Sequence, residues 1–531
     1  MGKSLFKGAM ILGIAGLIVK VMGAFFRIPL GNIIESEGMG YYSTSYPVYV
    51  SLLVISTAGF PTAISKLVSE KMALKDRKGA HRIFKISFMM LFVIGIITSF
   101  VLYFGADFMV NHMFKNPKAY YSMRAIAPAL FFVSLMSAYR GYFQGMQNMK
   151  PTAISQIIEQ FFRVGLGLYL AIYFISEGKD IAAAGASFGA TAGAFAGSLF
   201  MFLVYFLNRK YIKQSIKKQS HEFEEENAQK VIGKILNIAI PITIGAAVIP
   251  MMSLIDTSIV MRRLQSSGFS VVESSELFGQ LTGMAATLVN LPQVLTMAMA
   301  MSLVPLVSEY FIKKEVETAK EVTNMALKTS FLISMPAAFG LCSLSVPIMK
   351  MLFPKESASA GHILFFLSFG IIFLCAIQVL TGIFQGMGHA HIPVKNLFVG
   401  GVLKIIVSYS LTGIKVLNVK GAAIGTITAY FVAFVLNIRD MNKLMNIKID
   451  LKKSMSKSFA ASFVMGVSCF IMHKLFSFIL SNTLSTIISI SIGIFLYFVL
   501  ILKIKGITKE EIMKLPKGSK ITSVLEKVQL L

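Results

Sequence analysis

Long apolar segments dominate this sequence and leave the chain few possible folds. Fourteen of them come close to the roughly 20 apolar residues that cross a bilayer as a helix. They lie at approximately residues 8–30, 43–66, 83–105, 122–146, 153–176, 182–207, 232–262, 278–308, 325–348, 359–385, 393–415, 420–438, 457–476 and 483–503. Composition agrees, because 55% of the residues are hydrophobic and only 14% are charged, against about 25% charged in soluble domains. We therefore expect an all-α polytopic membrane protein.

The positive charge of the chain sets its expected orientation. A net charge of +26 would suggest a nucleic-acid partner in a soluble protein, but here Lys and Arg gather in alternate loops, such as 66–85 and 209–234. The positive-inside rule places these loops in the cytoplasm. We expect a multi-pass protein with both termini cytoplasmic and no nucleic-acid partner. The basic loops can also attract anionic membrane lipids.

Short repeated motifs predict two parallel halves. Leu-Val-Ser-Glu stands at 67–70 and 306–309, and Phe-Gln-Gly-Met at 143–146 and 384–387. Six helices per half is an even number, so both halves enter from the same side. The predicted organisation is an N-lobe at 1–207, a cytoplasmic linker at 208–231, a C-lobe at 232–440, two additional helices at 441–503 and a cytoplasmic tail at 504–531.

The first segment carries two cations within its apolar run. Lys20 and Arg27 are seven residues apart and share one helix face with Gly13, Gly16 and Gly23. A cation facing lipid at the helix centre costs at least about 2.5 to 3.5 kcal/mol. One interpretation is that each side chain reaches the membrane interface. The other is that both face a water-filled cavity that accepts an anion.

A second polar stripe lies in the segment 153–176. Glu159 and Arg163 are four residues apart and can form an ion pair within the helix. Alternatively, Arg163 binds substrate and Glu159 couples ion or proton movement. Lys404 is the counterpart of Arg163 in the second half and has Gly400 where the acid would stand. Lys404 is therefore the better candidate for a cationic cavity.

The segment 232–262 contains one further carboxylate with several possible roles. Asp256 could be a counter-ion to Lys20 or Arg27, a protonation site or a cation ligand. It could also lie near the outer interface beside Arg262 and Arg263. Glu159 and Asp256 are thus the candidates for ion or proton coupling.

Amides and hydroxyls form polar rows in other segments. Gln280 and Asn290 lie in the segment 278–308, and Gln378 lies in the segment 359–385. Each can simply form hydrogen bonds between helices, worth about 0.6 kcal/mol apiece. Because such rows occur in both halves, we expect a wet central cavity in which these side chains meet a polar substrate.

Motifs for catalysis and cofactors are lacking in the sequence. It contains no zinc-spaced His–Glu motif, no Gly-x-Ser-x-Gly, no Walker loop and no dinucleotide fingerprint. The three cysteines all lie in apolar segments without metal-ligand spacing. We expect a protein that is not an enzyme and has no cofactor and no metal site.

Four stretches carry a resemblance to a known family. They are Lys20-Val-Met-Gly-Ala-Phe-Phe-Arg27-Ile-Pro, the stretch 38–42 (Gly-Met-Gly-Tyr-Tyr), the stretch 59–70 that ends in Leu-Val-Ser-Glu, and the stretch 141–146 (Gly-Tyr-Phe-Gln-Gly-Met). With the segment 292–309, these resemble the MurJ/SpoVB-type flippases of the multidrug/oligosaccharidyl-lipid/polysaccharide exporter superfamily. The pattern is most similar to the sporulation-protein-B-like branch of Gram-positive bacteria.

The resemblance implies a two-lobed protein of the bacterial cell membrane. It would flip an undecaprenyl-pyrophosphate-linked glycan, the peptidoglycan precursor lipid II, by alternating access and as a monomer. Lys20 and Arg27 match the family's basic positions in the first helix and would meet the pyrophosphate. Our own hypothesis adds Lys404 to these two cations. The last two helices would shelter the lipid tail. Gram-negative members carry further arginines where Leu53 or Val54 and Thr287 stand here, so this cavity is less basic.

Three other functions are alternatives. One is a flippase for another lipid-linked polysaccharide. Another is a cation-coupled multidrug exporter, whose chemistry would favour intramembrane carboxylates over cations. The third is a scaffold that recruits cell-wall or spore-coat enzymes, which would need no polar stripes inside the helical bundle.

Overall fold

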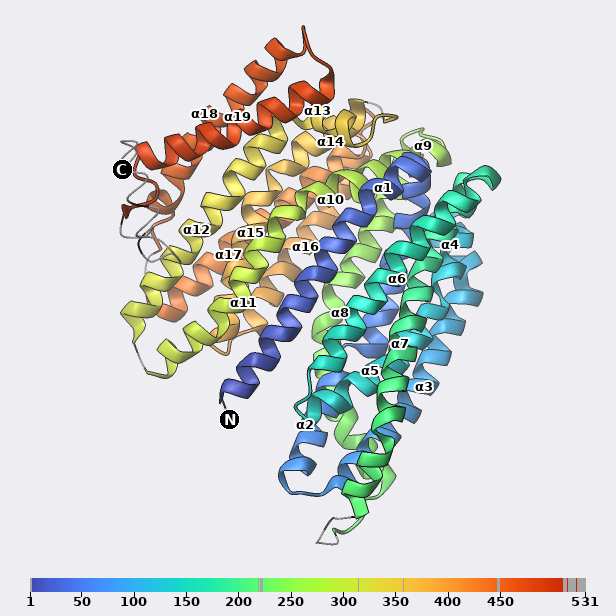
Figure 1. The fold of residues 1–531 in the computed structure, drawn as a ribbon. Coiled ribbons are helices and arrows are strands. Elements are labelled where there is room, and N and C mark those ends of the chain that lie inside the picture. The colour runs from blue at the N-terminus through green and yellow to red at the C-terminus, as the bar shows by residue number, and fades with distance from the viewer. Residues whose placement is uncertain are drawn as a thin grey trace. The chain divides into compact units, whose positions relative to one another are not determined.

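The computed structural model describes residues 2–217, 219, 223–313, 315–356, 358–446, 449–509, 513 and 522, with the side chains of residues 2–10, 316 and 453 left out. This described part is helical and contains no strand, as expected (Figure 1). It forms two compact units, residues 1–284 and 285–531. Most of the predicted tail at 504–531 lies outside the described residues.

The first unit contains long helices joined by short turns. Its α-helices are α1 (Gly2–Thr57), α2 (Phe60–Ala73), α3 (Arg77–Phe108), α4 (Tyr120–Ile126), α5 (Pro128–Gly145), α6 (Lys150–Phe174), α7 (Lys179–Lys217), α8 (Ala228–Ser266) and α9 (Val271–Phe278). Short 3-10 and π turns complete it: the π turns η1 (Met109–Met113) and η4 (Gly279–Ala285), and the 3-10 turns η2 (Pro117–Ala119) and η3 (Ile175–Glu177). Helix α5 is central, since it packs against α2, α3 and α7.

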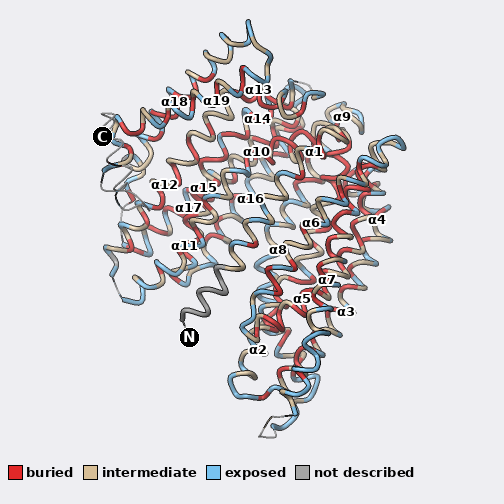
Figure 2. The backbone as a smooth tube through the Cα atoms, viewed as in Figure 1, coloured by how far each residue is buried: buried red, intermediate tan, exposed pale blue. Residues whose placement is uncertain are grey.

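The second unit repeats this plan with added helices. Its elements are α10 (Ala286–Val289), α11 (Leu291–Ile312), α12 (Val316–Ser343), α13 (Ser345–Leu352), α14 (Ala358–Ser368), α15 (Gly370–Gly386), α16 (His391–Thr412), α17 (Lys420–Met445), α18 (Leu451–Phe476) and α19 (Asn482–Lys503). Helix α15 is central here, because it packs against α11, α12 and α17. Buried residues concentrate along α5 and α15 (Figure 2).

The predicted number of fourteen membrane helices is not confirmed. Within the described residues, twelve helices are long and apolar enough to span a membrane, or thirteen if the pair α14 and α15, bent by 43°, is one span. One of the twelve stretches is Ile11–Ala73, with 63 residues. As one straight helix it would be about 95 Å long, roughly three times the hydrocarbon thickness, so it contains more than one crossing.

Two predicted segments have different boundaries because helices break inside them. The predicted segment 43–66 covers the end of α1 and the start of α2, which are separated at Ala58 and Gly59. Pro61 lies in the first turn of α2, where its missing N–H would have no partner within the helix. The predicted segment 278–308 covers η4, α10 and most of α11, and Asn290 separates α10 from α11. Pro292 lies in the first turn of α11, a position that also tolerates proline.

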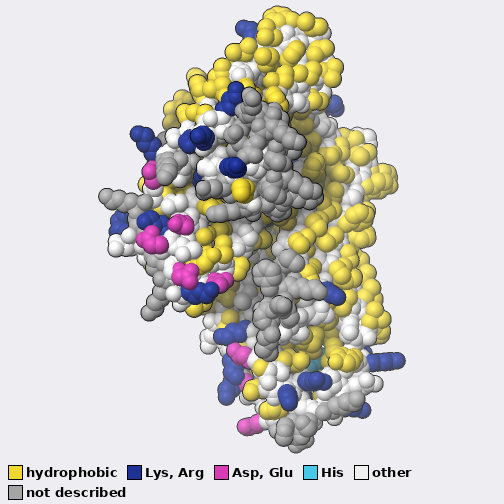
Figure 3. All heavy atoms as spheres, turned by 60° about the vertical axis from the view of Figure 1, so that its left-hand side comes forward, with side chains coloured by type: hydrophobic (Ala, Val, Ile, Leu, Met, Phe, Trp, Pro, Cys, Tyr) yellow, Lys and Arg dark blue, Asp and Glu magenta, His cyan; other side chains and the backbone are white. Residues whose placement is uncertain are grey.

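The surface of the helices is suited to lipid. Helix α3 buries small or polar residues such as Ser87, Gly95 and Thr98, while Phe100 and Phe104 on its other face are more than half exposed. A soluble protein would show the opposite pattern. Hydrophobic side chains cover broad areas of the surface in Figure 3. Together with its spans, this makes the chain a multi-pass membrane protein.

A close helix contact recurs in both units and supports the predicted repeat. In the first unit a Cβ on Gly145 of α5 would lie 2.7 Å from Cβ of Val68 on α2. In the second unit a Cβ on Gly386 of α15 would lie 3.0 Å from Cβ of Val307 on α11. These residues belong to the repeated Phe-Gln-Gly-Met and Leu-Val-Ser-Glu motifs. The two motifs therefore encode one helix–helix contact that is used twice.

The linker is shorter than predicted because helices extend into it. Helix α7 continues to Lys217 and α8 begins at Ala228, so only part of the range 208–231 is non-helical; residues 218 and 220–222 are outside the described part. Helix α8 belongs to the first compact unit, whose boundary with the second falls at 284/285. The predicted lobes at 1–207 and 232–440 stay a prediction about membrane-spanning repeats.

Candidate functional site

Arg27 on α1 contacts η4 and the second half of its own helix. Its Nη1 donates a hydrogen bond to the carbonyl oxygen of Thr282 in η4 over 3.1 Å, and its guanidinium lies 5.9 Å from the ring centre of Tyr46. Arg27 is half-buried, whereas Lys20, two turns earlier on the same face, is exposed. A cation over an aromatic face is stabilised by the ring quadrupole. The structure therefore fixes the position of Arg27 among polar and aromatic groups.

A row of tyrosines follows on the second half of α1. Tyr42, Tyr46 and Tyr49 lie on one face, with ring centres 6.0 Å apart between neighbours. Tyr42 is 5% exposed and Tyr49 is 1% exposed. Tyr46 is half-buried, so the row lies largely inside the protein, beside arginines. Tyr42 lies within electrostatic reach of both Arg27 and Arg163.

A cluster of charged residues lies between α5 and α6. Nη2 of Arg140 lies 3.1 Å from Oε2 of Glu159, and Nη2 of Arg163 lies 3.7 Å from Oε1 of the same carboxylate. Arg163 also donates to the hydroxyl of Tyr49 at 3.5 Å. All three charged side chains are 13–17% exposed. The predicted Glu159–Arg163 pair is present, but Arg140 is the nearer partner, and the sequence analysis missed it.

Small residues on α7 make room for this cluster. A Cβ on Gly189 would lie 2.5 Å from the carbonyl oxygen of Arg163, and one on Gly193 would lie 2.3 Å from that of Glu159. Because α7 approaches closely at these glycines, its backbone covers one side of α6. This small-residue packing is typical of membrane helix pairs and leaves the charged side chains directed toward α1 and α5.

Lys404 occupies in the second unit the place that Arg163 has in the first. A Cβ on Gly425 of α17 would lie 3.1 Å from the carbonyl oxygen of Lys404 on α16, as Gly189 does with Arg163. Lys404 is half-buried. Gln378 on α15 is also half-buried, and Asn290 is exposed at the break before α11. Each of these three predicted residues belongs to the second unit.

The remaining predicted residues of the first unit are buried. Asp256 on α8 is 9% exposed, and Gln280 in η4 is 4% exposed. Arg262, on the same helix, donates to the carbonyls of His112 and Met113. Gln280 lies on η4, the turn whose Thr282 carbonyl accepts from Arg27. No group of three metal-ligating side chains occurs among the described residues.

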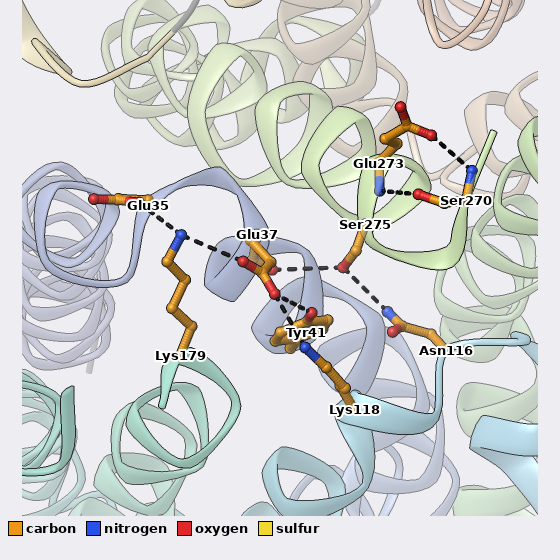
Figure 4. Close-up of polar contacts among 9 residues, drawn as sticks. All are labelled: Glu35, Glu37, Tyr41, Asn116, Lys118, Lys179, Ser270, Glu273 and Ser275. Carbon is orange, nitrogen blue, oxygen red and sulfur yellow. Dashed lines mark hydrogen bonds and ion pairs between the residues drawn. The ribbon is translucent and has the colours of Figure 1, made fainter. Parts of the chain in front are cut away.

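A network of ion pairs braces the break in α1 (Figure 4). The backbone breaks at Glu35, whose φ of 57° and ψ of −174° are costly for any residue except glycine. Nζ of Lys179 at the start of α7 lies 2.7 Å from Glu35 and 3.3 Å from Glu37. Lys118 also contacts the carboxylate of Glu37, at 3.4 Å. These ion pairs stabilise the bend that turns the second half of α1 back.

The same network of contacts extends to Asn116, just before η2, and to Ser275 on α9. Ser275 donates to the carbonyl of Glu37 at 3.5 Å, and Asn116 donates to the hydroxyl of Ser275 at 3.4 Å. Backbones come close here, because a Cβ on Gly40 would lie 2.1 Å from the carbonyl oxygen of Ser275. The segment after α9 is η4, which supplies the carbonyl that receives Arg27. These contacts thus help to position η4 and the carbonyl that accepts from Arg27.

Comparison with solved structures identifies the class of fold. The chain is similar to a multidrug resistance MATE family transporter of the MOP superfamily in an inward-facing conformation, with a TM-score of 0.68 at 15% identity, covering 83% of this chain and 98% of that one. It is also similar to the lipid II flippase MurJ in an inward closed conformation, with a TM-score of 0.66 at 17% identity, covering 92% and 98%. The fold is that of MOP-superfamily transporters.

Sequence comparison identifies the family. The model of the family "Polysaccharide biosynthesis protein" matches residues 5–311, and the chain belongs to this family. The MatE family model matches residues 241–410. Stage V sporulation protein B of Bacillus subtilis (strain 168) is 27% identical over 516 residues, 96% of this chain and 97% of that protein. Lipid II flippase MurJ of the same organism is 26% identical, covering 81% of each chain.

Proposed function

We propose that this chain is a flippase that moves an undecaprenyl-pyrophosphate-linked glycan from the inner to the outer leaflet of the bacterial cell membrane. Relatives named as a lipid II flippase and as a sporulation protein support this class. We further propose lipid II as the substrate, alternating access as the mechanism, and cytoplasmic termini. The predicted monomeric state stays a prediction.

One observation carries the proposal. Two arginines contact a single tyrosine row in the first unit: the guanidinium of Arg27 lies over the ring of Tyr46, and Arg163 donates to the hydroxyl of Tyr49. Guanidinium groups match the geometry of phosphate oxygens. A diphosphate cannot cross hydrocarbon without such groups, because moving an unpaired ion out of water into an apolar medium costs a large free energy. Lys20 and Lys404 are proposed to add positive charge for the same ligand.

The amides are proposed to meet the uncharged part of the substrate. Gln280, Asn290 and Gln378 can donate to and accept from sugar hydroxyls or peptide groups. Asp256 and Glu159 are proposed as candidates for ion or proton coupling. For Glu159, the ion pair with Arg140 means that a coupling role would require this pair to open.

Rescue of a bacterium depleted of its own lipid II flippase tests the proposal. The parent chain, the variant Lys20→Ala/Arg27→Ala and the control Arg209→Ala/Lys210→Ala are compared at matched membrane levels; both control residues are exposed at the end of α7. We expect the parent and the control to restore growth and the first double variant to fail. Rescue by both double variants would keep the function and overturn the site. Failure of the well-expressed parent would overturn lipid II as substrate.

A cation-coupled multidrug exporter is the second candidate. The MatE match and the structural similarity to a MATE transporter favour it. An exporter of cationic drugs would depend on Asp256 and not on Arg27. Expression in a drug-sensitive host separates the two functions: drug resistance that is lost in Asp256→Asn and kept in Arg27→Ala would favour export over lipid flipping.

A further inference from the structure

The carboxylate of Glu159 is shared unequally between two arginines. Oε2 receives Nη2 of Arg140 at 3.1 Å, within hydrogen-bond range, while Arg163 is 3.7 Å from Oε1. Arg140 is also anchored through Nε, which donates to the hydroxyl of Ser155 at 3.0 Å. Glu159 is therefore bound mainly by Arg140.

Arg163 keeps donors that the described residues do not use. A guanidinium has five N–H donors. Among the described residues, those of Arg163 reach only Tyr49 at 3.5 Å and Glu159 at 3.7 Å, and its buried Nε has no hydrogen-bond partner. The buried Oε1 of Gln156, two turns earlier on α6, has no partner there either. Buried polar atoms are almost always hydrogen-bonded, so this arrangement points to a ligand that the protein itself does not supply.

The second half of the chain lacks counterparts of both Arg140 and Glu159. At the spacing that relates the repeated motifs, Thr381 takes the place of Arg140 and Gly400 takes that of Glu159, while Lys404 corresponds to Arg163. Thr381 is satisfied within its own helix, donating to the carbonyl of Ile377 at 2.7 Å. The acid and the additional arginine thus occur together in one half and are absent together in the other. In both halves one positive charge remains.

We propose that Arg140 is a positioning residue, which binds the carboxylate of Glu159 so that Arg163 stays available for a phosphate group of the substrate. This inference rests on the proposed function, because it assigns the ligand of Arg163 as the diphosphate of a polyprenyl-linked substrate. Without Arg140, the carboxylate of Glu159 would move the short distance to Arg163 and occupy the donors that the phosphate needs. Arg140 itself does not touch the ligand.

Charge variants of the full-length protein in detergent test the proposal through ligand binding. The probe is farnesyl diphosphate, with farnesol as the uncharged comparison. We expect Arg140→Gln to weaken diphosphate binding by about tenfold, since one charge-assisted hydrogen bond is worth about 1.5–3 kcal/mol. Arg140→Gln/Glu159→Gln should restore binding to within about threefold of the parent, because the cluster again carries one positive charge.

Two further variants complete the series. Glu159→Gln leaves two positive charges and should bind the diphosphate more tightly than the parent. Arg140→Lys keeps the charge and should bind like the parent. Arg209→Gln, an exposed arginine on α7, is the matched control and should change nothing. Farnesol binding should be equal in all variants, because it carries no charge for Arg163 to bind.

The outcomes separate this inference from the proposed function. If the parent does not bind farnesyl diphosphate better than farnesol, the proposed function fails. If the parent binds but Arg140→Gln binds equally well, or if removal of Glu159 does not restore binding, Arg140 has only a structural role and the inference is overturned. If Arg140→Gln does not fold, Glu159→Gln decides: tighter binding supports the inference and unchanged binding overturns it.

Discussion

Replacing Gly40 by alanine should disrupt the first unit at the contact between α1 and α9. A Cβ at this position would lie 2.1 Å from the carbonyl oxygen of Ser275, whereas ordinary contact begins at 3.4 Å. The two backbones must therefore separate by about 1.3 Å, and a backbone carbonyl cannot rotate away as a side chain can. Overpacking costs roughly 1–3 kcal/mol, and a rigid neighbour places this case near the upper end.

The helix propensity of alanine offsets part of that cost. Alanine is favoured over glycine inside a helix by about 1 kcal/mol, so the expected net loss for Gly40→Ala is about 2 kcal/mol. For a unit of 284 residues, such a loss lowers Tm by about 3 °C. The same displacement moves η4, so the carbonyl of Thr282 leaves Arg27, and transport should fall as well.

A matched glycine on α8 provides the control. Gly245 is helical, and a Cβ there would have no atom within 4 Å, so Gly245→Ala should raise Tm slightly or leave it unchanged. Both variants are assayed by thermal unfolding of the purified full-length protein and by transport. If Gly40→Ala is as stable as Gly245→Ala, the close approach of α1 and α9 is not a constraint on the fold and the reasoning is refuted.

Three further predictions concern charged groups and one aromatic ring. Lys179→Ala should lower Tm, because Glu35, which has the strained backbone, and Glu37 both lose the cation that they share. Equal unfolding curves for Lys179→Ala and the parent would show that these ion pairs do not stabilise the bend. In the linker, ion pairs with lysines including Lys234 lower the pKa of Glu226 to about 2, so its stabilisation is complete above pH 4.5 and is lost as pH falls toward 2. The Tm difference between the parent and Glu226→Gln should therefore be constant from pH 7 to 5, shrink below pH 4.5, and shrink in 1 M salt; a difference that changes between pH 7 and 5 would refute this assignment. Tyr46→Phe should keep substrate binding, whereas Tyr46→Leu should weaken it several-fold, since the arginine above the ring needs an aromatic face; equal binding by both variants would argue against this role.

Features that reside within one helix could be predicted from the sequence. The spacing of Glu159 and Arg163 fixes their proximity, because residues four apart are neighbours on any helix, and the structure has them 3.7 Å apart. The correspondence of Arg163 and Lys404 also follows from the repeated motifs and is reproduced by the packing of both on glycines of the next helix. Long apolar runs predict membrane helices because hydrocarbon leaves the backbone no other partner.

Contacts between helices could not be predicted in this way. Arg140 lies 19 residues before Glu159, and nothing in its own segment distinguishes it from a cation at a helix end. The residue at the bend, Glu35, is itself neither glycine nor proline, so its position is not marked in the sequence. It forms an ion pair with Lys179, which is more than 140 residues away. Tyrosine in an apolar segment is typical of the membrane interface, where aromatic residues are enriched, and only packing reveals that Tyr42 and Tyr49 are buried.

The repeated contact of Gly145 with Val68 and of Gly386 with Val307 has a consequence for how such chains change over time. A Cβ on either glycine meets the branched carbon of its valine and also a backbone carbonyl oxygen, that of Ser65 at 2.8 Å for Gly145 and that of Val304 at 2.7 Å for Gly386. A smaller valine would relieve only part of this clash, so both glycines are expected to be retained among homologues. Because the two interfaces have similar shapes, exchanging the valine-bearing helix segments between the halves should preserve both, which a chimaeric chain can demonstrate.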